Sequence, residues 1–219
     1  MTKTRYRLKF LADRFEGWNV SDFKFRAVQD FVDERLDVVS SGSVARDMAV
    51  IKAILNKARR EELTDFVPNF PRVKGSKPRT RWLTVDEETR LVAEAAPHLK
   101  HLIYFAADTG GRKSELLSLD WRNVDLMQKR VTFRDTKNGE DRSVRLCARA
   151  ERTLLALGPK KLGPVFTFNG KAIKCTKKGF DAARRRSGIE DIRFHDLRHT
   201  FASRLVQGGV PLYEVMSLT

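Results

Sequence analysis

The side chains best suited to binding an anion and moving a proton lie in three separate segments. Arg112 follows a pair of glycines, Lys137 precedes Asn138-Gly139, and His195 lies three residues before Arg198. Arginine stays charged and can donate two parallel hydrogen bonds to an oxyanion. Lysine and histidine can transfer protons when burial or neighbouring charge shifts their pKa values. If these side chains met in space, they could bind a phosphate and supply a proton.

Each of these residues also has a simpler interpretation when it is considered alone. An arginine beside a glycine pair is usually a solvated loop residue, and a lysine at a hairpin tip is usually exposed. His195 and His199 have the i, i+4 spacing of a zinc-binding helix, but no Glu-x-x pattern or further ligand lies near them. A surface pair or a helix cap is commoner than a metal site, so we expect no metal.

The sequence around these residues predicts elements that could position them. Residues 83–95 form a helix that opens with a capping box of Thr84 and Glu87, and residues 99–109 form a buried helix. Residues 131–146 read as a β-hairpin, because Asn-Gly favours a type I′ turn. Residues 174–187 and 195–207 are predicted helices, and the second would carry His195 and Arg198 on one face.

A smaller helical region precedes this part of the chain. Residues 21–37 and 43–63 have apolar side chains at helical spacing, with Ser21 and Ser43 as candidate N-caps. Residues 67–81 contain three prolines, one glycine and several positive charges, which disfavour a helix or strand. We therefore expect a linker there, and a mainly α chain with a small antiparallel β-sheet.

The charge of the chain indicates what it binds. It has 43 Lys and Arg against 28 Asp and Glu, a net charge of +15, which favours nucleic acid or an acidic membrane surface. No apolar stretch is long enough for a transmembrane helix. The two cysteines form no CxxC pair and are expected to be reduced thiols in a cytoplasmic protein.

Basic residues also cluster on two segments, the linker and residues 160–186. The second segment holds nine basic residues and a single acidic one, Asp181, whereas a solvated face usually mixes both signs. One-sign clustering is typical of contacts to a phosphate backbone. The predicted DNA-binding residues are Lys77, Arg79, Arg81, Lys174, Lys177, Lys178, Arg184 and Arg185.

Taken together and in this order, the segments resemble the tyrosine recombinase (phage integrase) family. They read DTGGRKSELLSLDWRNVDL, TKNGEDRSVRL and FHDLRHTFASRLVQGGVPLYEVMSLT, at residues 108–126, 136–146 and 194–219. The resemblance covers roughly residues 20–219. It implies a helical core-binding (SAM-like) DNA-binding domain at 1–68, a basic linker at 69–81, and an incomplete tyrosine recombinase catalytic domain at 82–219.

The resemblance also implies roles for the residues. Arg112 and Arg198 would hold the non-bridging oxygens of a scissile phosphate, and Lys137 would protonate the leaving 5′ oxygen. His195 would donate a hydrogen bond or assist proton transfer, and Glu115 would orient Arg112. The implied reaction is transesterification through a 3′-phosphotyrosine intermediate, without metal or other cofactor. The implied partners are duplex DNA and further recombinase subunits, in a cytoplasmic, nucleoid-associated, bacterial or phage-encoded protein.

The nucleophilic tyrosine of the family has no match in this sequence. Tyr6 is placed in an N-terminal tail, Tyr104 in a buried helix, and Tyr213 in the segment that precedes the family's Gly-His pair. The favoured interpretation is a truncated recombinase that is inactive alone. The alternatives are a non-catalytic DNA-binding regulatory protein, a chain that receives its tyrosine from another subunit, and a type IB topoisomerase-like enzyme.

Overall fold

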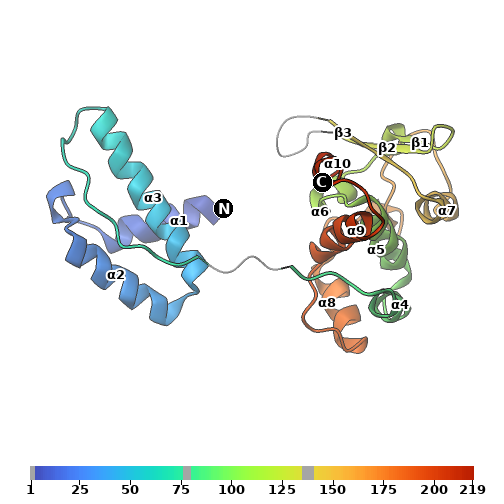
Figure 1. The fold of residues 1–219 in the computed structure, drawn as a ribbon, viewed down its shortest axis with the longest axis horizontal. Coiled ribbons are helices and arrows are strands. Elements are labelled where there is room, and N and C mark those ends of the chain that lie inside the picture. The colour runs from blue at the N-terminus through green and yellow to red at the C-terminus, as the bar shows by residue number, and fades with distance from the viewer. Residues whose placement is uncertain (1–2, 76–79, 135–140) are drawn as a thin grey trace. The chain divides into compact units, whose positions relative to one another are not determined.

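A computed structural model describes residues 3–75, 80–134 and 141–219 (Figure 1). It divides into two compact units, within residues 1–79 and 80–219, each with its own hydrophobic core. The predicted fold class is confirmed, because the chain is mostly helical with small antiparallel sheets. No helix in the described ranges combines the length and apolar character needed to cross a bilayer.

In the described residues 3–75, the N-terminal unit contains three α-helices and one short 3₁₀-helix. These elements are α1 (Lys3–Arg14), η1 (Val20–Asp22), α2 (Phe25–Val38) and α3 (Ser41–Arg60). The sequence interpretation missed α1 and placed Tyr6 in a tail, which is wrong. The helix escaped notice because it is strongly basic, and only Leu11 on it is buried in the core.

Both predicted caps in this unit are also wrong. Helix α2 begins at Phe25 after Lys24, and Ser21 lies in η1 instead. Helix α3 begins after Ser40, so that Ser43 lies inside its first turn. Each serine lies three positions from the observed N-cap and offers the same local signal, and tertiary packing decides where the first turn closes.

Part of the segment that was predicted to be a linker packs against the core of the N-terminal unit. Phe31 and Val44 are fully buried between the helices, while Val67, Phe70 and Val73 of the following extended segment pack against the same cluster. The chain is therefore held on this unit at least as far as Val73. Its prolines exclude a helix there, and its apolar side chains nevertheless favour packing over solvation.

The second unit is built around the buried helix α5 (Pro97–Thr109), which packs against helices α4, α6, α7 and α9. Its other elements are α4 (Val85–Ala93), α6 (Lys113–Leu117), η2 (Trp121–Asn123), β1 (Val124–Asp125), β2 (Arg130–Phe133), β3 (Arg142–Arg145), α7 (Ala148–Ala156), β4 (Thr167–Phe168), β5 (Lys171–Ala172), α8 (Lys177–Arg186), α9 (Asp196–Gln207) and α10 (Leu212–Ser217). The capping box of Thr84 and Glu87 opens α4 as predicted.

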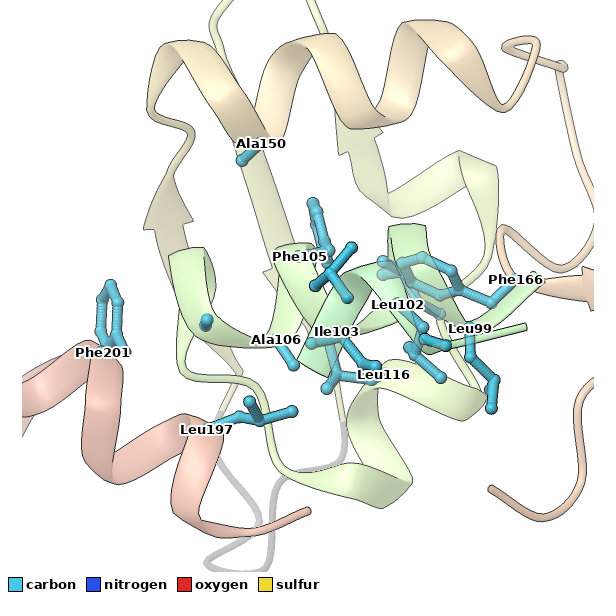
Figure 2. Packing of buried hydrophobic residues seen from close by; sticks show 14 of the residues in the cluster. Leu99, Leu102, Ile103, Phe105, Ala106, Leu116, Ala150, Phe166, Leu197 and Phe201 are labelled. Carbon is cyan, nitrogen blue, oxygen red and sulfur yellow. The ribbon is translucent and has the colours of Figure 1, made fainter. Parts of the chain in front are cut away.

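Helix α9 is fixed to α5 through apolar side chains. Leu197 and Phe201 project from α9 toward α5, where Ala106 and Ile103 are fully buried (Figure 2). The same face of α9 is anchored by a buried hydrogen bond from the Leu83 backbone N–H to the Thr200 hydroxyl, at 2.9 Å. This packing places the first turn of α9 beside the turn that follows α5.

The predicted hairpin is present as strands β2 and β3. They pair antiparallel with Val131 opposite Val144 and Phe133 opposite Arg142, and β1 extends the sheet on the other side of β2. Val131, Phe133 and Val144 face the core, as the alternation of a half-buried strand requires. The turn between the strands, including Lys137, lies outside the described residues.

Candidate functional site

The turn between α5 and α6 is shaped by two glycines. Gly110 ends α5 in the left-handed conformation with φ of 61°, and a Cβ atom there would clash with a ring carbon of Phe201. A Cβ atom at Gly111 would lie 2.7 Å from the Leu116 side chain. Only glycine tolerates both the backbone angle and the contact at residue 110. Gly110 therefore allows α9 to approach the turn that presents Arg112, and Gly111 allows Leu116 of α6 to pack close to it.

Arg112 lies at the start of α6 and is held by Glu115. Its backbone N–H donates to Glu115 Oε2 at 2.8 Å, and its Nη1 donates to Glu115 Oε1 at 2.7 Å. The Glu115 side chain is 4% exposed and that of Arg112 is 28% exposed. Burial opposes the charge of Glu115, yet hydrogen bonds from Arg112 and Arg142 hold its pKa below the ordinary value. Glu115 is thus a fixed carboxylate that orients the arginine.

Arg198 reaches the same turn from α9. Its Nη1 donates to the Gly110 carbonyl at 2.6 Å, and the residue is 9% exposed. Burial, followed by the positive charges of Arg112 and Arg142, lowers the pKa of Arg198 to about 10. A guanidinium held at such a position is short of negative charge, so an incoming anion would be stabilised there.

His195 immediately precedes α9 and belongs to the same group of side chains. Partial burial, then the charges of His199 and Arg198, lower the pKa of His195, and Arg112 contributes in the same direction. Its ring lies edge-on to that of His199, with centroids 5.2 Å apart. The helix begins at Asp196, so His195 stands at its N-cap rather than on its face. A neutral imidazole there can donate a hydrogen bond through its N–H and accept a proton at its other ring nitrogen.

Arg142 of β3 completes the cluster, and the sequence interpretation did not single it out. Its Nη2 donates to Glu115 Oε2 at 2.8 Å, and its side chain is 9% exposed. Its Nη1 donates to the Leu218 carbonyl at the end of α10. One signal was available: Arg142 lies opposite Phe133 in the predicted hairpin, on the strand face that packs inward.

The cluster can bind an oxyanion but holds a surplus of positive charge without one. Arg112, Arg142 and Arg198 act on one another electrostatically, and the carboxylate among them is Glu115. Guanidinium groups from β3, α6 and α9 therefore surround one small region. No group of three or more potential metal ligands occurs within the described parts of the chain.

Three predicted residues lie outside the described ranges, namely Lys137, Lys77 and Arg79. Strands β2 and β3 flank the segment that contains Lys137, and β3 also carries Arg142. The role predicted for Lys137 as a general acid therefore stays a prediction.

The predicted DNA-binding residues differ in how their charges are used. Arg81 pairs with Glu87 at 2.5 Å and with Asp191 at 2.8 Å. Arg184 donates to the carbonyls of Glu190 and Ile192. Lys177 pairs with Asp181 at 2.7 Å on the surface of α8. The remaining three are exposed: Lys174, Lys178 and Arg185. Arg81 and Arg184 thus hold the unit together, whereas the exposed residues are available to a partner.

Comparison with known proteins gives this site a family. Residues 81–219 match the phage integrase family. The integrase of Salmonella phage P22 is 36% identical over 190 residues, covering 77% of this chain and 48% of that protein. The shufflon-specific DNA recombinase of Escherichia coli is 32% identical over 189 residues, covering 83% of this chain and 48% of that protein. The chain thus spans about half the length of these relatives.

Solved structures agree on the fold. A lambda integrase dimer bound to a COC′ core site has a TM-score of 0.78 at 19% identity, covering 100% of this chain and 88% of that one. The Tn1549 transposon integrase with transposon right end DNA has a TM-score of 0.79 at 15% identity, covering 100% and 85%. The residues that match the family model include Arg112, His195 and Arg198. The chain belongs to the phage integrase family of tyrosine recombinases.

Proposed function

We propose that this chain binds duplex DNA and holds a scissile phosphodiester between Arg112 and Arg198 for site-specific strand transfer. The convergence of Arg112, Arg142 and Arg198 around one carboxylate supports this proposal most directly, because burial and mutual repulsion have lowered the pKa of Arg198 to about 10. A phosphate would offset that repulsion. Related proteins in DNA complexes, such as lambda integrase at its core site, have the same fold.

In the proposed reaction a tyrosine oxygen attacks the phosphorus and the bond to the 5′ oxygen breaks. The product is a 3′-phosphotyrosine and a free 5′ hydroxyl, whose proton comes from Lys137. Arg112 and Arg198 stabilise the charge that builds up on the non-bridging oxygens. His195 donates a hydrogen bond to them through its N–H, and its other ring nitrogen accepts the tyrosine proton. The phosphodiester is exchanged for a phosphotyrosine ester of similar energy, so the proposed reaction needs no cofactor.

The nucleophile of this reaction is not assigned to a tyrosine of this sequence. Tyr6 is exposed on α1, and the ring of Tyr104 lies beneath the guanidinium of Arg149 at 4.8 Å. The Tyr213 hydroxyl donates to Glu214 at 3.1 Å on the surface of α10. The proposal therefore includes a tyrosine that lies outside these 219 residues. It also includes further recombinase subunits on the same DNA, in a nucleoid-associated assembly.

Sulfate tests the phosphate site without the need for turnover. We expect sulfate to shift the NMR signals of the Nε–Hε groups of Arg112 and Arg198, and duplex DNA to displace it. Arg198→Ala should abolish the shift at Arg112, whereas Arg122→Ala, which removes an exposed arginine paired with Asp120, should leave it unchanged. Sulfate shifts confined to residues outside the cluster would contradict the proposal.

A nicked duplex that traps covalent intermediates tests the second half of the proposal. The chain alone should form no covalent adduct on denaturing electrophoresis, because an arginine clamp without an attacking oxygen initiates nothing. An adduct that maps to Tyr213 would show that this tyrosine is the nucleophile after all.

A further inference from the structure

Arg142 is a buried cation with an unusual set of partners. Its guanidinium lies 4.8 Å from the centre of the Phe133 ring, and its Nε is buried without a hydrogen-bond partner among the described residues. Its pKa is lowered by burial, against the opposing effect of Glu115. Burying a charge costs free energy unless its contacts compensate. The contacts of Arg142 therefore indicate a role other than filling space in the core.

The first of these contacts acts on Arg112 through Glu115. Glu115 Oε2 accepts from both the Arg112 backbone N–H and Arg142 Nη2, each at 2.8 Å, while Oε1 accepts from Arg112 Nη1. The carboxylate is therefore held from two sides, and its orientation fixes the guanidinium of Arg112. Among the described residues, the Glu115 carboxylate would otherwise be held only by Arg112, the residue that it orients.

The second contact acts on α10. Leu218 is the C-cap of this helix, and its carbonyl accepts a hydrogen bond from Arg142 Nη1. The last carbonyls of a helix have no partner within it, and a cation near them is also favoured by the helix dipole. A single guanidinium thus connects β3, the carboxylate on α6 and the end of α10.

We propose that Arg142 is a positioning residue of the phosphate clamp, which holds Glu115, and so Arg112, in the orientation that receives phosphate oxygens while fixing the end of α10. This inference rests on the proposed function, since the ligand of the clamp is taken to be a phosphate. It differs from a general effect of charge, because it requires two donors in the planar geometry that arginine has and lysine lacks.

The test compares three variants at two residues of the same strand. Arg142→Met removes the contacts and the charge, Arg142→Lys keeps the charge, and Arg145→Met removes an exposed charge three residues away on β3. In the free protein, the amide protons of Arg112 and Leu218 report the two contacts by hydrogen exchange. With sulfate, the Arg112 Nε–Hε signal reports affinity.

In both Arg142 variants we expect the Arg112 and Leu218 amide protons to exchange about tenfold faster, and sulfate to bind about tenfold more weakly. A change of about tenfold is typical of the coupling between charged residues in contact. Arg145→Met should change neither quantity. Glu115→Gln, which keeps the side-chain size, should speed exchange at Arg112 but not at Leu218, and it remains informative if Arg142→Met does not fold.

Two results would overturn the inference. One is sulfate affinity in Arg142→Lys equal to that of the unmodified chain, since charge alone would then suffice. The other is unchanged exchange at Arg112 in both Arg142 variants. A third result would separate the inference from the proposed function. If the Arg142 variants exchange faster but the unmodified chain binds no sulfate, the positioning contacts are supported and the proposed function is contradicted.

Discussion

Each unit of the molecule contains a buried carboxylate held by two arginines, and the two sites serve different ends. In the N-terminal unit, Asp47 of α3 accepts from Arg7 of α1 at 2.6 Å and from Arg35 of α2 at 3.2 Å. In the second unit, Glu115 is held by Arg112 and Arg142. Both carboxylates are almost fully buried.

The difference lies in what surrounds each group. The arginines of Asp47 come from two neighbouring helices, and Arg35 also stacks on Phe10 at 4.1 Å, so the group joins three helices into one bundle. Around Glu115 a further arginine, Arg198, adds positive charge that one carboxylate does not balance. The same pairing therefore joins three helices in one unit and, in the function that we propose, holds the phosphate clamp in the other.

The largest expected effect separates these two uses directly. Asp47→Ala should lower the free energy of unfolding of the N-terminal unit by about 3–5 kcal/mol, because it leaves two largely buried arginines without their counter-charge. Sulfate should not restore the loss. Glu115→Ala should destabilise the second unit, and sulfate should restore part of that loss. Urea denaturation, monitored by hydrogen exchange in each unit, measures both losses of stability. Equal responses of the two variants to sulfate would mean that the two carboxylates do not differ in role.

The glycine turn at the anion site gives the next effect. Gly110→Ala should lower the free energy of unfolding by about 2–5 kcal/mol, which combines left-handed backbone strain with the clash against Phe201. Gly188→Ala is the matched control, because Gly188 has φ of 69° but a Cβ atom there would meet no other atom within 4 Å. It should cost only about 1–2 kcal/mol, for the strain alone. Equal losses of stability in the two variants, measured by thermal denaturation, would mean that α9 moves at Phe201 and relieves the clash.

Acid should weaken the anion-site unit through Glu115. Its folded pKa lies below the ordinary value of 4.5, so its stabilising effect is present above that value and is lost as pH falls through the lowered pKa. Glu115→Gln should therefore be less stable than the unmodified chain at neutral pH, and the difference should shrink in acid. Urea denaturation at several pH values measures this. A difference that grows in acid would reverse the expected sign.

The smallest effect concerns surface charge on α8. Lys178→Glu and Arg185→Glu should each weaken binding to any duplex and lower the slope of log affinity against log salt by about 1 for each phosphate that the protein no longer neutralises. Arg184→Gln should act mainly on stability, because Arg184 donates to the Glu190 and Ile192 carbonyls. Sequence-dependent losses at Lys178 would instead indicate contacts to bases.

The family, the fold class and the segments that carry the arginines could be predicted from the amino-acid sequence alone. Three local signals were sufficient for this: the Gly-Gly-Arg turn, the hairpin around residues 131–146, and the His-x-x-Arg spacing at residues 195–198. Each depends on neighbours within a few residues, where backbone preferences act directly. The capping box of Thr84 and Glu87 was readable for the same reason.

Arg112 and Arg198 were predicted from the sequence, but which further charges join them, and which are used within the fold, is decided by the tertiary packing. Strand alternation places Arg142 on the inward face of the predicted hairpin, but its partner Glu115, 27 residues earlier in the chain, is decided only when the hairpin packs against α6. Arg81 is a predicted DNA contact, and only packing shows that it also binds Asp191, 110 residues away. Charges interact through space rather than along the chain, so their partners are fixed by packing that no local pattern encodes.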